Sequence, residues 1–152
     1  MTTIGQNPID SGFTNKAEAK NQTVNGLKEG KWIEYFTVDH IQTKDTSSQT
    51  YSRLIIYKSG LQNGIAHEYY PTGELYSKTP YKNGEINGLV KWFYKSGKLE
   101  QETRFSNGKE NGMDKVFYEN GKVRSTTIYT NGVEGKTKNY FENGSEIDEN
   151  KE

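Results

Sequence analysis

The sequence has no cysteine, only three prolines and no long hydrophobic run among its 152 residues. The absence of cysteine excludes disulfide bonds and thiol nucleophiles and removes the commonest ligand of structural zinc sites. Without a run of about 18 apolar residues, the chain has no candidate for a membrane-spanning helix. The stretch Met1–Pro8 also lacks the basic residues and apolar segment of a signal peptide. We therefore expect a cytoplasmic protein, or an envelope-associated one if a leader precedes the sequence given.

An excess of charge of either sign is missing too. The 20 acidic and 20 basic residues cancel, so no net field favours nucleic acid or an anionic membrane as a partner. Arginine occurs only at Arg53, Arg104 and Arg124. This scarcity argues further against a groove for single-stranded nucleic acid, which combines basic and aromatic side chains. We expect no nucleic acid among the partners.

Aliphatic residues are scarce, and aromatic residues take their place. Hydrophobic residues make up 30% of the chain and the mean hydropathy is −1.01, yet the chain contains 11 Tyr, 6 Phe and 2 Trp. Each aromatic side chain buries a large area. A lean composition can therefore still fold, and we expect the core to be thin.

Glycines and aromatics recur with a nearly constant period. The unit Gly64–Gly88 returns as Gly88–Gly112 and, one residue shorter, as Gly112–Gly135, so the period is 23 to 24 residues. A longer copy, Gly30–Gly64, precedes it, and a truncated copy follows Gly135. Periods in this range are typical of repeat architectures.

Each unit predicts one β-hairpin. A run that ends in two adjacent aromatics, such as Leu89–Tyr94, is followed by a tight glycine turn, such as Lys95–Gly97. In the return strand Leu99 and Thr103 share one face and polar residues occupy the other, which is the two-residue period of a strand. We therefore predict an all-β fold, an elongated antiparallel meander of about five tandem β-hairpin repeats with little or no helix.

The array leaves three segments outside the hairpin pattern. Residues 1–22 are polar and predict an N-terminal arm that is disordered or packed as a cap, and residues 23–145 form the repeat array. Within the array, residues 37–50 replace the short turn of the other units. Lengthening a surface loop costs little, so a tolerated insertion is favoured over a functional loop. Residues 146–152 predict an acidic flexible tail.

With this pattern in view, the chain resembles the bacterial variant of the MORN repeat found in YwqK-like antitoxin proteins. The resemblance covers roughly residues 24 to 145 and implies an elongated sheet of hairpins used for protein contacts. The insertion and the polar arm depart from it. The shared pattern places Leu or Val two residues after the hairpin glycine and ends in aromatic-x-Asn-Gly, as in Gly73–Leu75, Gly97–Leu99, Gly121–Val123, Tyr81–Gly84, Phe105–Gly108 and Tyr129–Gly132.

No set of residues predicts an active site. His40 lies near Asp39 and Asp45 in the insertion, but a catalytic or metal site needs further partners. His67 occupies a position where another unit has Lys91, so we expect a solvated strand residue. The glycines belong to turns, and no phosphate-binding loop precedes a helix. We expect no catalytic residue, no metal and no cofactor.

The positions that depart from the repeat are the candidates for binding a partner. Trp32 and Trp92 stand where other units carry small or polar residues, and Trp, Tyr and Arg are enriched in interface hot spots. An equally favoured alternative is that each Trp fills a local gap in the sheet. The candidate partner-binding residues are Trp32, Asp39, His40, Lys44, Asp45, Trp92, Arg104 and Arg124.

These expectations favour a non-enzymatic protein-binding module. The resemblance implies an immunity or antitoxin protein that occludes a toxin encoded by a neighbouring gene. The alternative is a structural or envelope-associated scaffold without a toxin partner. A weaker third hypothesis is a hydrolase or carbohydrate-binding sheet that uses exposed aromatics. Because one fold hosts many functions, the step from repeat to function is an analogy.

Overall fold

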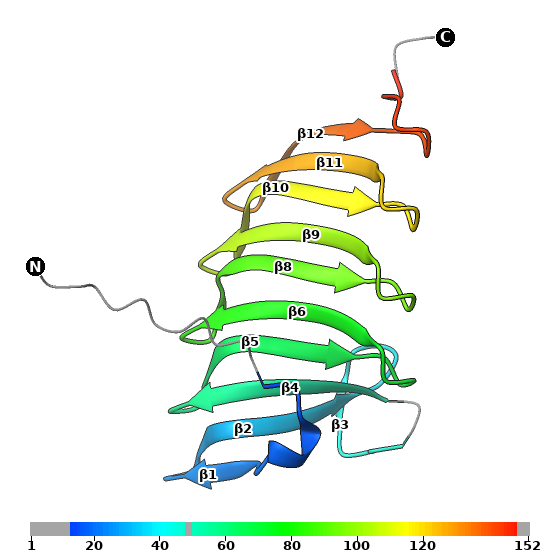
Figure 1. Ribbon diagram of the computed structural model, residues 1–152. Helices are drawn as coiled ribbons and strands as arrows, with labels where there is room; N and C mark the ends of the chain where they lie inside the picture. Colours follow the sequence, from blue (N-terminus) through cyan, green and yellow to red (C-terminus); the bar gives the residue numbers. More distant parts are fainter. Residues whose placement is uncertain (1–12, 48–49, 149–152) are drawn as a thin grey trace, which may run out of the picture.

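The computed structural model describes residues 13–47 and 50–148. Residues 1–12 of the predicted arm, 48–49 of the insertion and 149–152 of the tail lie outside the described residues. The described chain forms one 12-stranded antiparallel sheet. Figure 1 shows its strands one above another, from β1 at the bottom to β12 at the top. This confirms the predicted all-β meander of hairpin repeats. The helix among the described residues is one short 3-10 turn, η1 (Lys16–Glu18).

The strands follow one another in the sheet as they do along the chain. The order is β1-β2-β4-β5-β6-β8-β9-β10-β11-β12, with the short β3 paired to β2 and β7 to β6. The strands are β1 (Gln22–Val24), β2 (Leu27–Phe36), β3 (Gln42–Thr43), β4 (Tyr51–Lys58), β5 (Leu61–Tyr69), β6 (Leu75–Lys82), β7 (Glu85–Ile86), β8 (Gly88–Phe93), β9 (Leu99–Ser106), β10 (Lys109–Phe117), β11 (Val123–Thr130) and β12 (Val133–Asn139).

The turns that link successive hairpins have the backbone that their sequence demands. Asn83 and Gly84 have φ angles of 51° and 85°, which a two-residue type I′ turn requires and which Asn-Gly adopts at low cost. The N–H of Gly84 then donates to the Gln62 carbonyl of the preceding unit at 2.8 Å, and that of Gly108 donates to Ile86 O at 2.9 Å. These bonds dock each unit on the one before it.

A tyrosine ladder links the units at the other end of the strands. The Tyr70 hydroxyl donates to Phe93 O at 2.9 Å and the Tyr94 hydroxyl donates to Phe117 O at 2.6 Å. The Tyr118 hydroxyl continues the series to a carbonyl of the last unit. In these three units the second aromatic of the pair is thus a donor to the next unit. In the last unit this position is Phe141, which has no hydroxyl.

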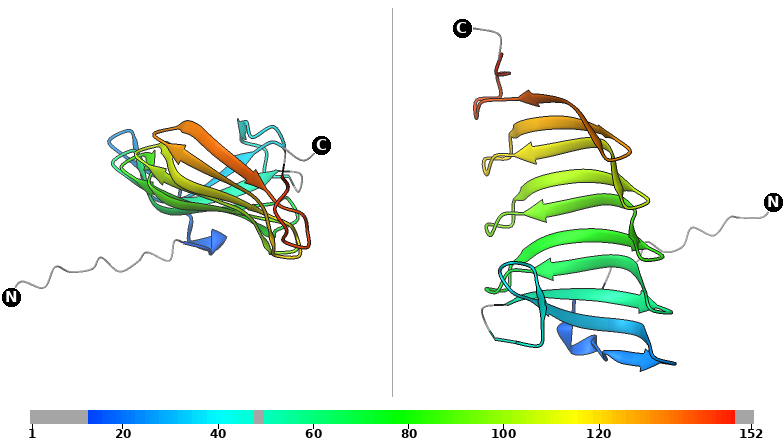
Figure 2. Two further views of the ribbon diagram at one scale, coloured as in Figure 1. Left: turned by 90° about the horizontal axis from the view of Figure 1, so that it is seen from above. Right: turned by 180° about the vertical axis from the view of Figure 1, so that it is seen from behind.

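The two faces of the sheet are covered differently. Cross-strand partners share a face, so Trp32 and Ile55 lie on one face, and Leu54 and His67 lie on the other. We call the first the insertion face and the second the arm face. In Figure 1 η1 lies in front of the sheet, and the view from behind in Figure 2 shows the insertion in front.

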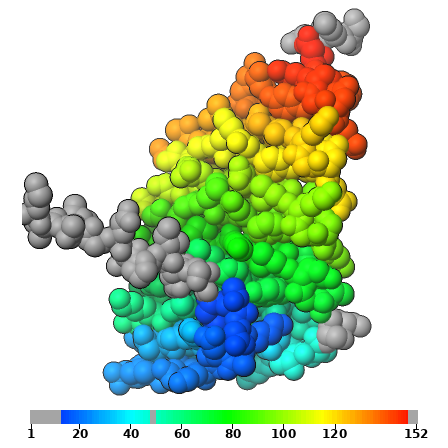
Figure 3. Space-filling view, in the orientation of Figure 1, coloured from blue at the N-terminus to red at the C-terminus, as the bar shows by residue number. Residues whose placement is uncertain are grey.

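Part of the predicted arm packs as a cap. The Phe13 side chain is 5% exposed and lies against Lys31, whose ammonium is 5.6 Å from the ring centre. The Asn21 side chain bonds the N–H and the carbonyl of Ile33 at 2.8 and 3.2 Å. Hydrogen bonds from the arm therefore cover the outer edge of β2. Figure 3 shows the described part of the arm, in blue, in front of the lower strands.

The core is thin and lies in the first half of the sheet. Ile55, Tyr57 and Ala66 form a buried cluster with Trp32 and Tyr81 packed against it. On the arm face Leu54 is fully buried. Aromatic rings supply much of this burial, as the composition predicts.

His67 corrects one expectation. We predicted a solvated strand residue, but its exposed fraction is 2%. The equivalent Lys91 remains half-exposed. The Lys16 ammonium of the arm lies 5.8 Å from the ring centre of Tyr69, two residues further along β5, so the arm reaches the face that His67 occupies. This cap lies over the first units, and the repeat pattern in the sequence gives no sign of it.

Candidate interaction surface

A row of side chains crosses the insertion face from the first hairpin to the third. In register, Glu34 pairs with Arg53, Arg53 with Glu68, Glu68 with Ser77, and Ser77 with Trp92. Partners in register lie about 5 Å apart on the same face. The hairpin geometry therefore brings Trp92 into line with a group of charged residues that are far apart in the sequence.

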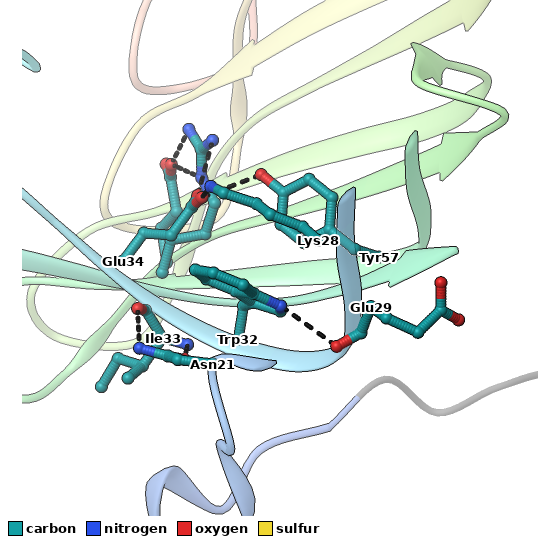
Figure 4. A network of polar contacts seen from close by, with 9 residues as sticks. Asn21, Lys28, Glu29, Trp32, Ile33, Glu34 and Tyr57 are labelled. Atoms are coloured by element: carbon teal, nitrogen blue, oxygen red, sulfur yellow. Dashed lines mark hydrogen bonds and ion pairs between the residues drawn. The ribbon is translucent and has the colours of Figure 1, made fainter. Parts of the chain in front are cut away.

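The centre of this group is the Glu34 carboxylate, which is shown in Figure 4. Glu34 is 5% exposed, and a buried carboxylate is tolerated only where it is paired. Its Oε1 accepts hydrogen bonds from Lys28 Nζ at 2.5 Å and from the Tyr57 hydroxyl at 2.8 Å. Burial and the hydrogen bond to Glu34 both raise the pKa of Tyr57. Tyr57 therefore remains a neutral donor.

Arg53 links Glu34 to the second unit. Its Nη2 lies 2.5 Å from Glu68 Oε1 and its Nη1 lies 3.8 Å from Glu34 Oε2, while the guanidinium sits 4.5 Å from the ring centre of Phe36. The Ser77 hydroxyl donates to the other Glu68 oxygen at 3.0 Å. Burial acts to lower the pKa of Arg53, but the nearby carboxylates outweigh burial and raise it. Arg53 is thus a fixed cation between two carboxylates.

Trp32 is half-buried beside this network. Its indole N–H donates to Glu29 O at 3.1 Å, and its ring meets Tyr57 edge-on with centres 5.9 Å apart. The Lys28 ammonium lies 4.6 Å above the Trp32 ring. These contacts support the alternative that Trp32 fills a gap in the sheet. Trp92 is also half-buried, on β8.

The insertion folds back on the sheet at the ends of the strands. β3 pairs with β2 through Tyr35 and Phe36, and the Thr37 N–H donates to Ile41 O at 2.9 Å. Asp39 and Lys44 are exposed. Asp45 accepts a hydrogen bond from the Ser47 N–H at 2.9 Å. The described part of the insertion is therefore held by backbone and side-chain hydrogen bonds.

His40 attaches the insertion to a cluster of tyrosines. Its ring centre lies 5.2 Å from that of Tyr51 and 5.9 Å from that of Tyr76. Tyr70 completes the cluster at 5.0 Å from Tyr76. Burial, followed by the negative charge of Glu100, raises the pKa of Tyr70 to about 12. The four rings pack as one aromatic cluster at the ends of the strands.

The two candidate arginines lie apart from this surface. Arg104 pairs in register with Leu89, which places it on the arm face, where its side chain is exposed. Arg124 is exposed at the start of β11, between the paired residues Val123 and Ser125. The structure thus gathers Trp32, Trp92 and the insertion around one face and leaves Arg104 on the other.

Sequence reasoning missed the charged network and one buried acid. Asp114 is 7% exposed and accepts hydrogen bonds from the Thr103 hydroxyl and, at 2.8 Å, from Gln101 Nε2. A signal existed, because Asp114 occupies the position of the apolar Ala66 and Val90 in other units. Opposite charges at Glu34 and Arg53 carried a similar signal, but the insertion hides their register.

The described residues contain neither a cluster of metal ligands nor a membrane-spanning helix. Within residues 13–47 and 50–148, no group of three or more His, Cys, Asp or Glu side chains is placed to hold a metal ion. In that same part of the chain no helix is long and apolar enough to cross a membrane.

Comparison with known proteins identifies three of the repeats. Residues 62–83, 86–107 and 111–131 match the MORN repeat variant. These matches coincide with the units of regular length and omit the one that carries the insertion. MORN repeats generally serve as non-enzymatic modules and indicate binding to a protein or a membrane.

Two further comparisons add little. A search of curated proteins gives no match. Among solved structures, the chain is similar to one described as the crystal structure of TarM, with 21% identity and a TM-score of 0.41. The similarity covers 62% of this chain and 18% of the TarM chain.

Proposed function

We propose that this protein is a non-enzymatic antitoxin or immunity protein, which neutralises a toxin encoded by a neighbouring gene by binding and occluding it through the insertion face. The observation that carries the proposal is the gathering of Trp92, Trp32 and the insertion around one face of a repeat sheet. The resemblance to YwqK-like antitoxins supplies the class of partner. The matching MORN repeats support the binding role.

The physical support for this face is preorganisation. Arg53 and Glu68 are fixed by mutual contacts of 2.5 to 2.6 Å, so few rotamers remain to be lost when a partner binds. Aromatic side chains with restricted rotamers, such as Trp92, are the usual anchors of interfaces. Such a surface can bind through shape and local charge even though the net charge of the chain is zero.

The mechanism is steric. A stable interface removes about 800 Å² from each partner, and a sheet face of several hairpins can supply that area without moving. Covering the toxin's active surface excludes its substrate. No residue of the antitoxin needs to react, which agrees with the absence of a catalytic pattern in the sequence.

The test is co-expression with the product of the neighbouring gene. We expect the wild-type chain to restore growth and to co-purify with that product, and Trp92→Ala to weaken the complex by at least about tenfold, as expected for a hot-spot residue. Phe141→Ala is the matched control, because Phe141 is a large aromatic with 52% exposure at the far end of the array. If the wild-type chain neither restores growth nor forms a complex, the scaffold alternative replaces the antitoxin function.

A further inference from the structure

The arm face carries a groove next to the part that the arm covers. It runs across β5, β6 and β8 to the start of β9 and has a volume of about 380 Å³. Its lining consists of apolar residues and two lysines, namely Ile65, Lys78, Pro80, Leu89, Lys91, Phe93 and Leu99. An apolar groove with a few polar groups is the usual form of a binding site.

The two lysines form a like-charged pair. Lys78 on β6 and Lys91 on β8 are direct cross-strand partners, an arrangement that destabilises a sheet. Neither ammonium forms an ion pair with the described residues. Glu102 is the other partner of Lys91 in register, and its carboxylate pairs with Lys115 at 3.7 Å. The groove therefore holds two adjacent positive charges that form no ion pair with the described residues.

The arm shows what kind of segment this face accepts. Phe13 is buried against the face, and Glu18 forms an ion pair with Lys31. The same Lys31 ammonium lies 5.6 Å from the Phe13 ring centre. One lysine thus contacts an aromatic ring and a carboxylate of the arm. The groove repeats this combination of lysine and apolar surface on the neighbouring strands.

We propose that the groove binds an extended segment of a partner protein that carries carboxylate and aromatic side chains. Its carboxylates pair with Lys78 and Lys91, and its aromatic ring packs on the apolar lining. The groove lies on the face opposite Trp32 and Trp92, so it does not depend on the antitoxin function or on the identity of the toxin. Charge complementarity and continuity with the arm select a peptide over other anionic ligands.

Binding of a labelled peptide to the full chain tests this proposal. The probe is a short peptide of alternating Glu and Phe, followed by fluorescence anisotropy, and its control is the same peptide with Lys in place of Glu. A third measurement uses vesicles of phosphatidylglycerol and phosphatidylcholine in place of the peptide. We expect binding of the Glu peptide alone, weakening as salt rises because the charges are screened.

Lys78→Glu separates binding from folding. The new carboxylate faces Lys91, so the melting temperature should stay constant or rise, whereas binding should weaken at least about tenfold. A purely structural role for Lys78 would lower both. Lys78→Met, which keeps the apolar stem, should weaken binding less. Lys109→Glu makes the same charge change at an exposed site on β10 and should leave binding unchanged.

Three results overturn the proposal. The first is equal binding of the Lys and Glu peptides. The second is an equal loss with Lys109→Glu and Lys78→Glu, which would show a non-specific charge effect. The third is binding of the vesicles without binding of the Glu peptide, which would assign the groove to a lipid surface.

Discussion

Replacing Glu34 by alanine tests whether the charged network holds the first two units together. The carboxylate is 5% exposed and accepts bonds from Lys28 and Tyr57. Its removal leaves the buried Tyr57 hydroxyl without an acceptor, which costs about 1–3 kcal/mol. Breaking a buried ion pair costs about 3–5 kcal/mol when the remaining charge stays buried.

The local geometry places the expected loss at the low end of that range. The Lys28 side chain is 32% exposed and can turn its ammonium to water, and Arg53 keeps Glu68 at 2.5 Å. We therefore expect Glu34→Ala to lower the free energy of unfolding by about 3 kcal/mol. Glu34→Gln keeps an acceptor for Tyr57, so it should cost about half as much.

The assay is chemical denaturation followed by tryptophan fluorescence, which reports on Trp32 beside the network. Glu119→Ala, at an exposed turn position, is the matched control and should change the free energy by less than about 0.5 kcal/mol. A double-mutant cycle with Tyr57→Phe should give a coupling of about 1.5 kcal/mol or more, as for hydrogen bonds to charged groups. A loss below about 1 kcal/mol, or a coupling near zero, would refute the reasoning.

Three further predictions follow from the strand ends, a close backbone contact and the insertion. Burial raises the pKa of Tyr70 from 10.0 to about 12. The contribution of Tyr70 to the free energy of unfolding is therefore complete below pH 10 and should be lost as the pH rises through 12. Unfolding midpoints measured between about pH 9 and about 12 check this. Gly88 has φ of +128°, and a Cβ there would lie 2.9 Å from Pro80 Cγ, so Gly88→Ala should cost about 2 kcal/mol or more. Gly73→Ala, with φ of +102° and no atom within 4 Å of the added Cβ, should cost less in the same denaturation assay, and equal losses would contradict the contact argument. Deleting residues 39–48 should leave the circular dichroism of the sheet intact and weaken the toxin complex, whereas an unchanged complex would show that the insertion is a tolerated surface loop.

The architecture was predictable because the repeat states it several times. Each Asn-Gly pair, such as Asn83–Gly84, predicts a turn of one type, and the two-residue alternation fixes which side chains share a face. Three independent copies make the period visible even with few aliphatic residues. The all-β meander therefore follows from local patterns alone.

The candidate surface was only partly predictable, because it depends on register across an irregular connection. Counting residues cannot align Glu34 with Arg53 through the insertion, so their contact stayed hidden. The burial of His67 was missed for a different reason. His67 lies on the face that the arm reaches, and the repeat gives no information about what lies over a given unit.

The difference in side-chain burial along the sheet determines the order in which the units unfold. Leu54, Ile55 and Val90 are almost fully buried in β4 and β8, whereas Val133 to Lys138 of β12 are exposed throughout. Because each unit contacts only its neighbours, local unfolding is expected to begin at β12. It should then advance one unit at a time toward the first hairpin. Amide hydrogen exchange would show this as protection factors that fall from the first units to β12. A partner bound at the insertion end contacts the units that open most rarely, so the complex can persist while the distant units unfold and refold.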